Sequence, residues 1–108
     1  MEDNFFSNRL SMLRIQKNVS AREISLSLGQ NPGYINNIES GKSLPSLTVF
    51  SYICEYLGIT EMEFFDSESK SPGTVNEINA LLLKMTPEQI ETVKILCTRF
   101  VHDNQKRR

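Results

Sequence analysis

Apolar residues recur at intervals of three and four along almost the whole chain of 108 residues, and no segment alternates apolar and polar residues as a strand does. Helices and strands place their side chains at different periods, so the pattern separates the two. The sequence therefore predicts an all-α protein. A chain of this length has room for one small domain with an appendage, and we expect five short helices followed by two longer ones.

Capping residues mark where the predicted helices begin. Residues 20–23 (SARE) and 60–63 (TEME) are capping boxes, in which a hydroxyl and a carboxylate satisfy amides of the first helical turn. Asn31, followed by Pro32, predicts the N-cap of a third helix, and Ser46 predicts that of a fourth. The expected helices span about 4–17, 20–29, 31–41, 46–58 and 60–65, followed by one from 74 and one from 86.

One polar stretch, residues 66–73, is typical of a linker and is closed by Pro-Gly. It predicts a compact domain over 1–66, a linker over 67–73 and a C-terminal helical region over 74–108, whose two helices we expect to pair as a hairpin. The first domain offers apolar residues of every helix to one core, including Phe64 and Phe65 from the fifth.

The reactive residues give no sign of an enzyme. His102 is the only histidine and has no Ser, Cys or metal partner in sequence, and neither a Gly-rich phosphate loop nor a metal-ligand cluster occurs. Cys54 and Cys97 each lie among apolar residues at helical spacing, which predicts buried free thiols. We therefore expect no catalysis, no cofactor and no metal. The acidic start and the short apolar runs favour a cytoplasmic protein that does not enter the membrane.

Charge is divided unevenly along the first domain, although the net charge is only -1. Residues 9–43 contain five basic and two acidic residues, whereas all four charged residues of 44–66 are acidic. Such a division allows a positive face toward phosphates. Arg14, Lys17, Arg22 and Lys42 are the candidate phosphate contacts, with an ordinary solvated role as the alternative for each.

Residues 20–41 predict a helix of about two turns, a short turn containing Gly29 and a second short helix, which is the helix-turn-helix arrangement of DNA-binding proteins. At about 100° per residue, the second helix buries Ile35 and Ile38 on one side. Asparagine has a poor helix propensity, but its side-chain amide can form hydrogen bonds with both N7 and N6 of adenine in the major groove. The candidate base-reading residues are Gly33, Tyr34, Asn36 and Asn37, with Tyr34 alternatively a core aromatic.

The stretch 9–65 resembles the Cro/repressor (Xre-like) helix-turn-helix family, most clearly in the pattern LGxxxxYIxxIExGKxxPSL at 28–47. The resemblance implies a five-helix domain that binds duplex DNA sequence-specifically as a dimer on a palindromic operator and so regulates transcription, as a repressor. It places 31–37 in the major groove and Lys42 and Ser43 near phosphate. Family members favour alanine where this chain has Ser25. With the resemblance, the candidate phosphate contacts are Arg14, Lys17, Arg22, Asn31, Ser40, Lys42 and Ser43.

The last two predicted helices carry apolar seams that a five-helix core cannot use. We expect these seams to form a homodimer interface, with residues 106–108 as a frayed basic tail. The alternatives are that the helices fold back on the first domain, or that the chain is an antitoxin or anti-regulator whose C-terminal helices bind a partner protein. The candidate interface residues are Ile78, Leu82, Ile90, Val93, Cys97 and Phe100.

Overall fold

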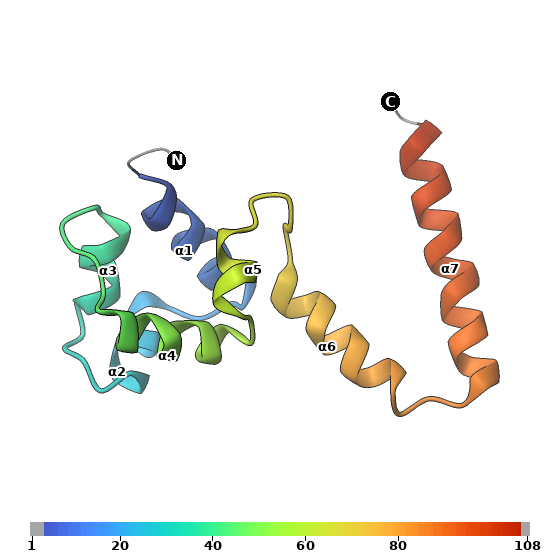
Figure 1. Cartoon of the computed structure of the whole chain (residues 1–108), viewed down its shortest axis with the longest axis horizontal. Helices are drawn as coiled ribbons and strands as arrows, with labels where there is room; N and C mark the ends of the chain where they lie inside the picture. Colours follow the sequence, from blue (N-terminus) through green and yellow to red (C-terminus); the bar gives the residue numbers. More distant parts are fainter. Residues whose placement is uncertain (1–3, 107–108) are drawn as a thin grey trace. The chain divides into compact units, whose positions relative to one another are not determined.

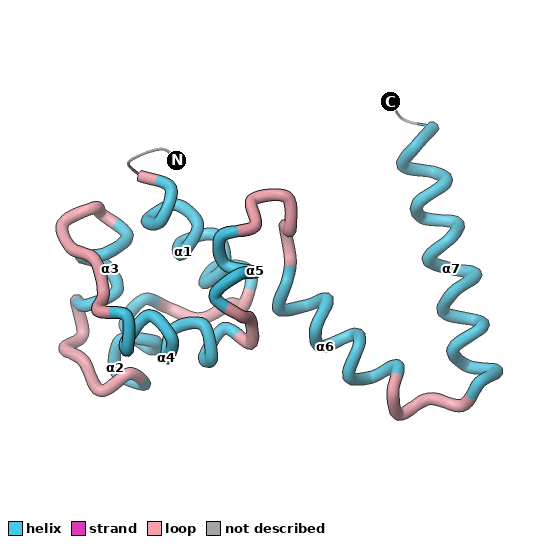
Figure 2. Tube along the Cα trace, in the orientation of Figure 1, coloured by secondary structure: helices cyan, strands magenta, loops and turns pink. Residues whose placement is uncertain are grey.

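The computed structural model describes residues 4–106, and this part of the chain forms seven helices and no strand (Figures 1 and 2), as the all-α prediction requires. The helices are α1 (Phe5–Gln16), α2 (Ala21–Ser27), α3 (Tyr34–Glu39), α4 (Leu47–Leu57), α5 (Glu61–Phe65), α6 (Pro72–Leu82) and α7 (Pro87–Lys106). The chain divides into two compact units, the first ending at Asn76 and the second beginning at Glu77. None of the described helices is long and apolar enough to cross a membrane.

Local capping fixes the starts of α2, α4 and α5 where the sequence predicts them. The Ser20 hydroxyl accepts a hydrogen bond from the amide of Glu23, and the Thr60 hydroxyl accepts one from the amide of Glu63. In both boxes the glutamate carboxylate in turn accepts a hydrogen bond from the amide of the capping residue. Ser46 caps α4 in the same way through the amide of Val49. Each such cap stabilises a helix by about 1 kcal/mol.

The third helix begins later than predicted. Asn31 is not its N-cap, because the Asn31 side-chain oxygen accepts a hydrogen bond from the amide of Gly33 at 3.0 Å and its carbonyl accepts one from the amide of Tyr34 at 3.1 Å. These bonds close a turn through residues 32 and 33, and Gly33 becomes the N-cap. An asparagine can satisfy the backbone locally in this way without starting a helix. As a result α3 has only six residues.

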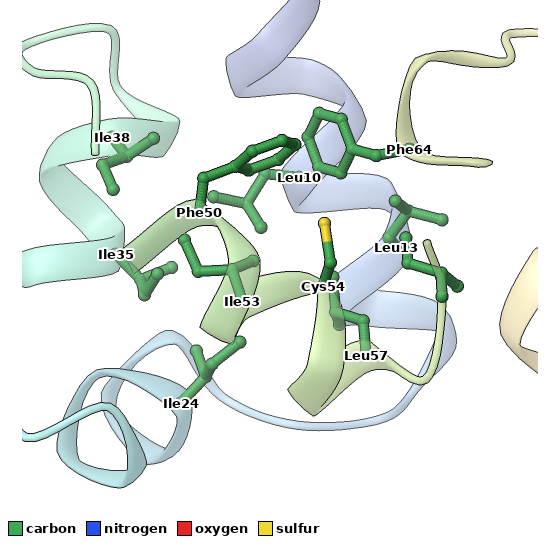
Figure 3. Packing of buried hydrophobic residues seen from close by; sticks show 11 residues of the cluster. Leu10, Leu13, Ile24, Ile35, Ile38, Phe50, Ile53, Cys54, Leu57 and Phe64 are labelled. Carbon is green, nitrogen blue, oxygen red and sulfur yellow. The ribbon is translucent and has the colours of Figure 1, made fainter. Parts of the chain in front are cut away.

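The core of the first unit is formed by side chains from all five short helices (Figure 3). Ile24 of α2, Ile35 of α3 and Ile53 of α4 are completely buried, each contributing about 1.5–3 kcal/mol through the hydrophobic effect. Phe64 is also buried and packs against Phe50 with a ring-centroid distance of 5.1 Å. Phe65 remains 43% exposed, so the prediction that it joins the core is only partly met.

The two cysteines differ in their surroundings. Cys54 is buried as predicted, and desolvation, with a smaller contribution from Glu61, raises the pKa of its thiol to about 12. Cys97 lies exposed on α7, so the prediction of a buried thiol there was wrong for the single chain. Helical spacing of apolar neighbours predicts burial only where another element covers the stripe.

The segment expected as a linker packs onto the first unit through Arg9. This side chain is only 5% exposed, and its guanidinium donates hydrogen bonds to the carbonyls of Phe64 at 2.6 Å and Ser69 at 2.8 Å, and to those of residues 63 and 66. Pro72 at the start of α6 is completely buried as well. The first unit therefore continues beyond the expected boundary at 66.

The C-terminal helices leave their apolar seam uncovered within one chain. None of the residues of α7 is buried, and Ile90 and Phe100 are 40% and 57% exposed. The two helices expected here are present as α6 and α7, and their pairing as a hairpin stays a prediction. Lys106 lies in the last turn of α7 rather than in a frayed tail. The other two tail residues, Arg107 and Arg108, lie outside the described residues.

Candidate nucleic-acid interface

Helix α3 is attached at its N-terminal end to α2 by one buried hydroxyl. Ser25 is completely buried, and its hydroxyl donates to the carbonyl of Ala21 at 2.7 Å while accepting from the amide of Ile35 at 3.0 Å. The amide of Ile35 lies in the first turn of α3, where no carbonyl of the same helix is available. The Ser25 hydroxyl therefore supplies an acceptor that α3 itself lacks and fixes α3 against α2.

Helix α1 holds the other end of α3 through two polar contacts. The Ser7 hydroxyl donates to the carbonyl of Ile38 at 2.7 Å. The Arg14 guanidinium forms a two-pronged ion pair with the Glu39 carboxylate, with N–O distances of 2.7 and 3.0 Å, and donates to the carbonyl of Val19 as well. A helix of six residues is not stable alone in water, so these contacts and its two buried isoleucines hold it in place.

The ion pair also determines the charge near α3. The side chains of Arg14 and Glu39 are only 17% and 10% exposed, and hydrogen bonding to Glu39 raises the pKa of the Arg14 guanidinium. Glu39 is the only charged residue of α3, and the pair neutralises it. Arg14 was a candidate phosphate contact, but three of its five N–H donors are directed to Glu39 and Val19 inside the fold.

The outer side of α3 is small, polar and exposed, as the helical spacing predicts. Gly33, Asn36 and Asn37 are exposed, whereas Ile35 and Ile38 are completely buried on the opposite side. Tyr34 lies between the two, partly buried and packed against the core, and desolvation raises the pKa of its hydroxyl. The structure thus brings the predicted base-reading residues together on one helix, with Tyr34 at the edge.

The remaining candidate phosphate contacts lie on the segments that enter α2 and leave α3. Lys17 follows α1 and Arg22 is in the first turn of α2, and both are exposed. Gly41, with φ of +81°, ends α3, and the amide of Lys42 donates to the carbonyl of Asn37 at 2.9 Å. The other exposed candidates are Asn31, Ser40 and Ser43.

Sequence reasoning missed the polar contacts behind α3. Ser7 and Ser25 are short polar residues at positions that the helical wheel assigns to the buried side, and this is the signal that could have identified them. Buried hydroxyls require hydrogen-bond partners, which the periodicity of one helix cannot name. The pairing of Arg14 with Glu39 joins residues far apart in the chain and had no local signal.

Two successive helices, α2 and α3, with a glycine turn between them and a polar outer face on the second, define a helix-turn-helix protein. Residues 8–70 match the family model described as helix-turn-helix domain, and because the match covers more than half of the chain, the chain belongs to this family. Neither a curated protein nor a solved structure matched the chain. The family match supports a DNA-binding regulator.

Proposed function

We propose that this protein is a transcriptional repressor of the Cro/repressor (Xre-like) type that reads duplex DNA with α3 in the major groove. The observation that carries the proposal is the exposed polar face of a helix whose orientation is fixed from behind. Base contacts require side chains held in a defined position, since a bidentate hydrogen bond tolerates little displacement. Ser25 and the Arg14–Glu39 pair supply that rigidity without occupying the outer face.

Gly33, Asn36 and Asn37 are the proposed base-reading residues, with Tyr34 at the rim. The backbone of Gly33 has φ of -94°, and a side chain there would meet only the Asn31 side-chain oxygen at 3.7 Å. Neither backbone conformation nor space therefore requires glycine. Glycine costs little at an N-cap, and the absence of a side chain at Gly33 leaves the start of α3 open to close approach of a ligand.

The proposed phosphate contacts are the exposed cations on the segments that enter α2 and leave α3. Lys17, Arg22 and Lys42 would supply the sequence-independent part of the affinity, with Asn31, Ser40 and Ser43 as polar contacts to phosphate. Arg14 is not proposed, because three of its five N–H donors bind Glu39 and Val19 within the fold. Neutralising one of the three cations is expected to reduce the slope of log K against log salt by about one.

A homodimer on a palindromic operator completes the proposal. The exposed apolar seam of α6 and α7 supports it, because a stripe of this kind on a water-exposed helix marks a binding surface. The same seam supports a second function, that of an antitoxin or anti-regulator whose C-terminal helices hold a partner protein. The residues proposed for either interface are Ile78, Leu82, Ile90, Val93, Cys97 and Phe100.

Selection of bound duplexes from a random DNA pool, at a stated salt concentration, tests DNA reading. We expect an enriched inverted repeat with half-site centres about one helical turn apart. Replacing Asn36 and Asn37 together by alanine is expected to lower discrimination by about 1–3 kcal/mol per lost base pairing while the fold is kept. The matched control is Asn79→Ala, the same change at an exposed position of α6. Unchanged discrimination in the double variant would refute the assigned reading face.

Sedimentation equilibrium separates the two uses of the C-terminal seam. Phe100→Asp places a charge on the seam and is expected to convert a dimer to a monomer, whereas His102→Asp, on the polar side of α7, is expected to leave the dimer intact. A wild-type chain that remains monomeric at micromolar concentration would contradict the homodimer and favour the partner-protein function.

A further inference from the structure

A groove of about 450 Å³ lies between the end of α2 and the outer face of α4, on residues that the proposed DNA interface does not use. Ser27 and Leu28 form one wall and Tyr52, Glu55 and Tyr56 form the other. Tyr52 is 53% exposed, whereas Tyr56 is partly buried and packs against the core. The groove thus presents two aromatic side chains and one carboxylate.

The electrostatic character of this groove is negative. The last residue of α2 and the last turn of α4 both contribute to it, and helix C-termini carry partial negative charge. Neither helix has a basic residue in its last turn, so no side chain of the same helix offsets this partial charge. Glu55 adds a full negative charge in a stretch, residues 44–66, whose charged residues are all acidic.

We propose that this groove binds an arginine side chain of a partner protein. A guanidinium is planar and stacks on tyrosine rings, where the ring face attracts a cation. It also carries several donors in a fixed fork, which suits a carboxylate such as that of Glu55 and nearby helix-end carbonyls at once. A lysine ammonium, which is a compact and strongly hydrated charge, would use the aromatic walls less well.

The open shape of the groove favours an arginine on a protein over a free small cation. Sites for small molecules usually enclose most of the ligand surface, whereas this groove is open along one side. A side chain whose backbone continues outside the groove gains contacts along the rim, including the apolar Leu28 and the hydroxyl of Ser27. The proposal is independent of DNA binding, because none of its residues belongs to the proposed DNA interface.

The test is a two-dimensional NMR titration of the full chain with the blocked peptide Gly-Ser-Arg-Ser-Gly and with the same peptide carrying citrulline, the neutral isostere of arginine. We expect shifts at residues 27, 28, 52, 55 and 56 with the arginine peptide, and an association constant about threefold to tenfold lower with citrulline. Glu55→Gln and Tyr52→Ala are each expected to weaken arginine binding by a similar factor. Glu68→Gln, which neutralises an exposed carboxylate outside the groove, is the matched control.

Three results would overturn the proposal. Equal binding of the arginine and citrulline peptides would show that the charge is not recognised. Unchanged binding by the Glu55→Gln variant would remove the carboxylate from the site. Binding of free argininamide as tight as that of the peptide would assign the groove to a small cation rather than a protein. Both variants are expected to retain wild-type thermal unfolding and DNA affinity, because Glu55 and Tyr52 are exposed.

Discussion

Removing the Ser25 hydroxyl tests whether contacts on the inner side of α3 hold this helix against α2. In Ser25→Ala the amide of Ile35 loses its hydrogen-bond acceptor, and Ile35 is completely buried. A buried amide without a partner costs about 1–3 kcal/mol. The better helix propensity of alanine returns about 0.5 kcal/mol, and loss of one oxygen atom leaves little cavity. The expected net loss in the free energy of unfolding is therefore about 0.5–2.5 kcal/mol.

Urea unfolding followed by circular dichroism measures this loss as a lower midpoint at an unchanged slope. Ser51→Ala is the matched control, because Ser51 is exposed on α4 and the same change there should be neutral or stabilise by up to about 0.5 kcal/mol. We also expect weaker specific DNA binding by Ser25→Ala under conditions where the variant is fully folded. A Ser25→Ala protein as stable as the Ser51→Ala control would refute the assigned role of the hydroxyl.

Three further predictions concern the polar contacts of the first unit. Arg9→Met leaves several carbonyls without donors and should lower the free energy of unfolding, measured in urea, by about 3 kcal/mol. We also expect faster proteolysis of the segment 66–71, and an unchanged rate would contradict the role of Arg9 in anchoring that segment. A double-mutant cycle with Arg14→Gln and Glu39→Gln should give a coupling of about 1–2 kcal/mol, and a value near zero would mean the pair does not hold α3. Hydrogen bonds from the Thr60 backbone and the Asn76 side chain lower the pKa of Glu63. This carboxylate therefore stabilises the fold above its ordinary pKa of 4.5, and the stabilisation is lost as the pH falls through the lowered pKa; Glu63→Gln should flatten that part of the urea-midpoint profile against pH.

The features predictable from sequence were those set by neighbouring residues. The capping boxes at Ser20 and Thr60 depend on residues three positions apart, and both form. The inner and outer sides of α3 follow from helical geometry, so Ile35 is buried and Asn36 is exposed. Local rules predicted the helix order and the candidate reading face for this reason.

The features that sequence could not predict depend on distant partners or on competing local bonds. Asn31 has two ways to satisfy nearby amides, as an N-cap or as a turn residue, and composition does not decide between them. No neighbouring residue marks Arg9 as buried, because its partners are carbonyls more than fifty positions away. Backbone carbonyls are present at every residue, so no sequence pattern reveals which of them a buried guanidinium will bind.

The position of the polar contacts behind α3 has a consequence for how affinity and specificity can be varied. Ser25 and Glu39 hold α3 from its inner side, while the cations Lys17 and Lys42 lie on flanking segments. Under the proposed function, changes to the outer face of α3 are therefore expected to alter which sequence is read, without altering the fold or the electrostatic attraction to DNA. Changes to the flanking cations should weaken binding to all sequences alike, because phosphate contacts carry no sequence information. Helix α3 has six residues and an uncharged outer face. Its stability therefore depends on the contacts at its inner side, and the attraction to phosphate depends on cations outside the helix.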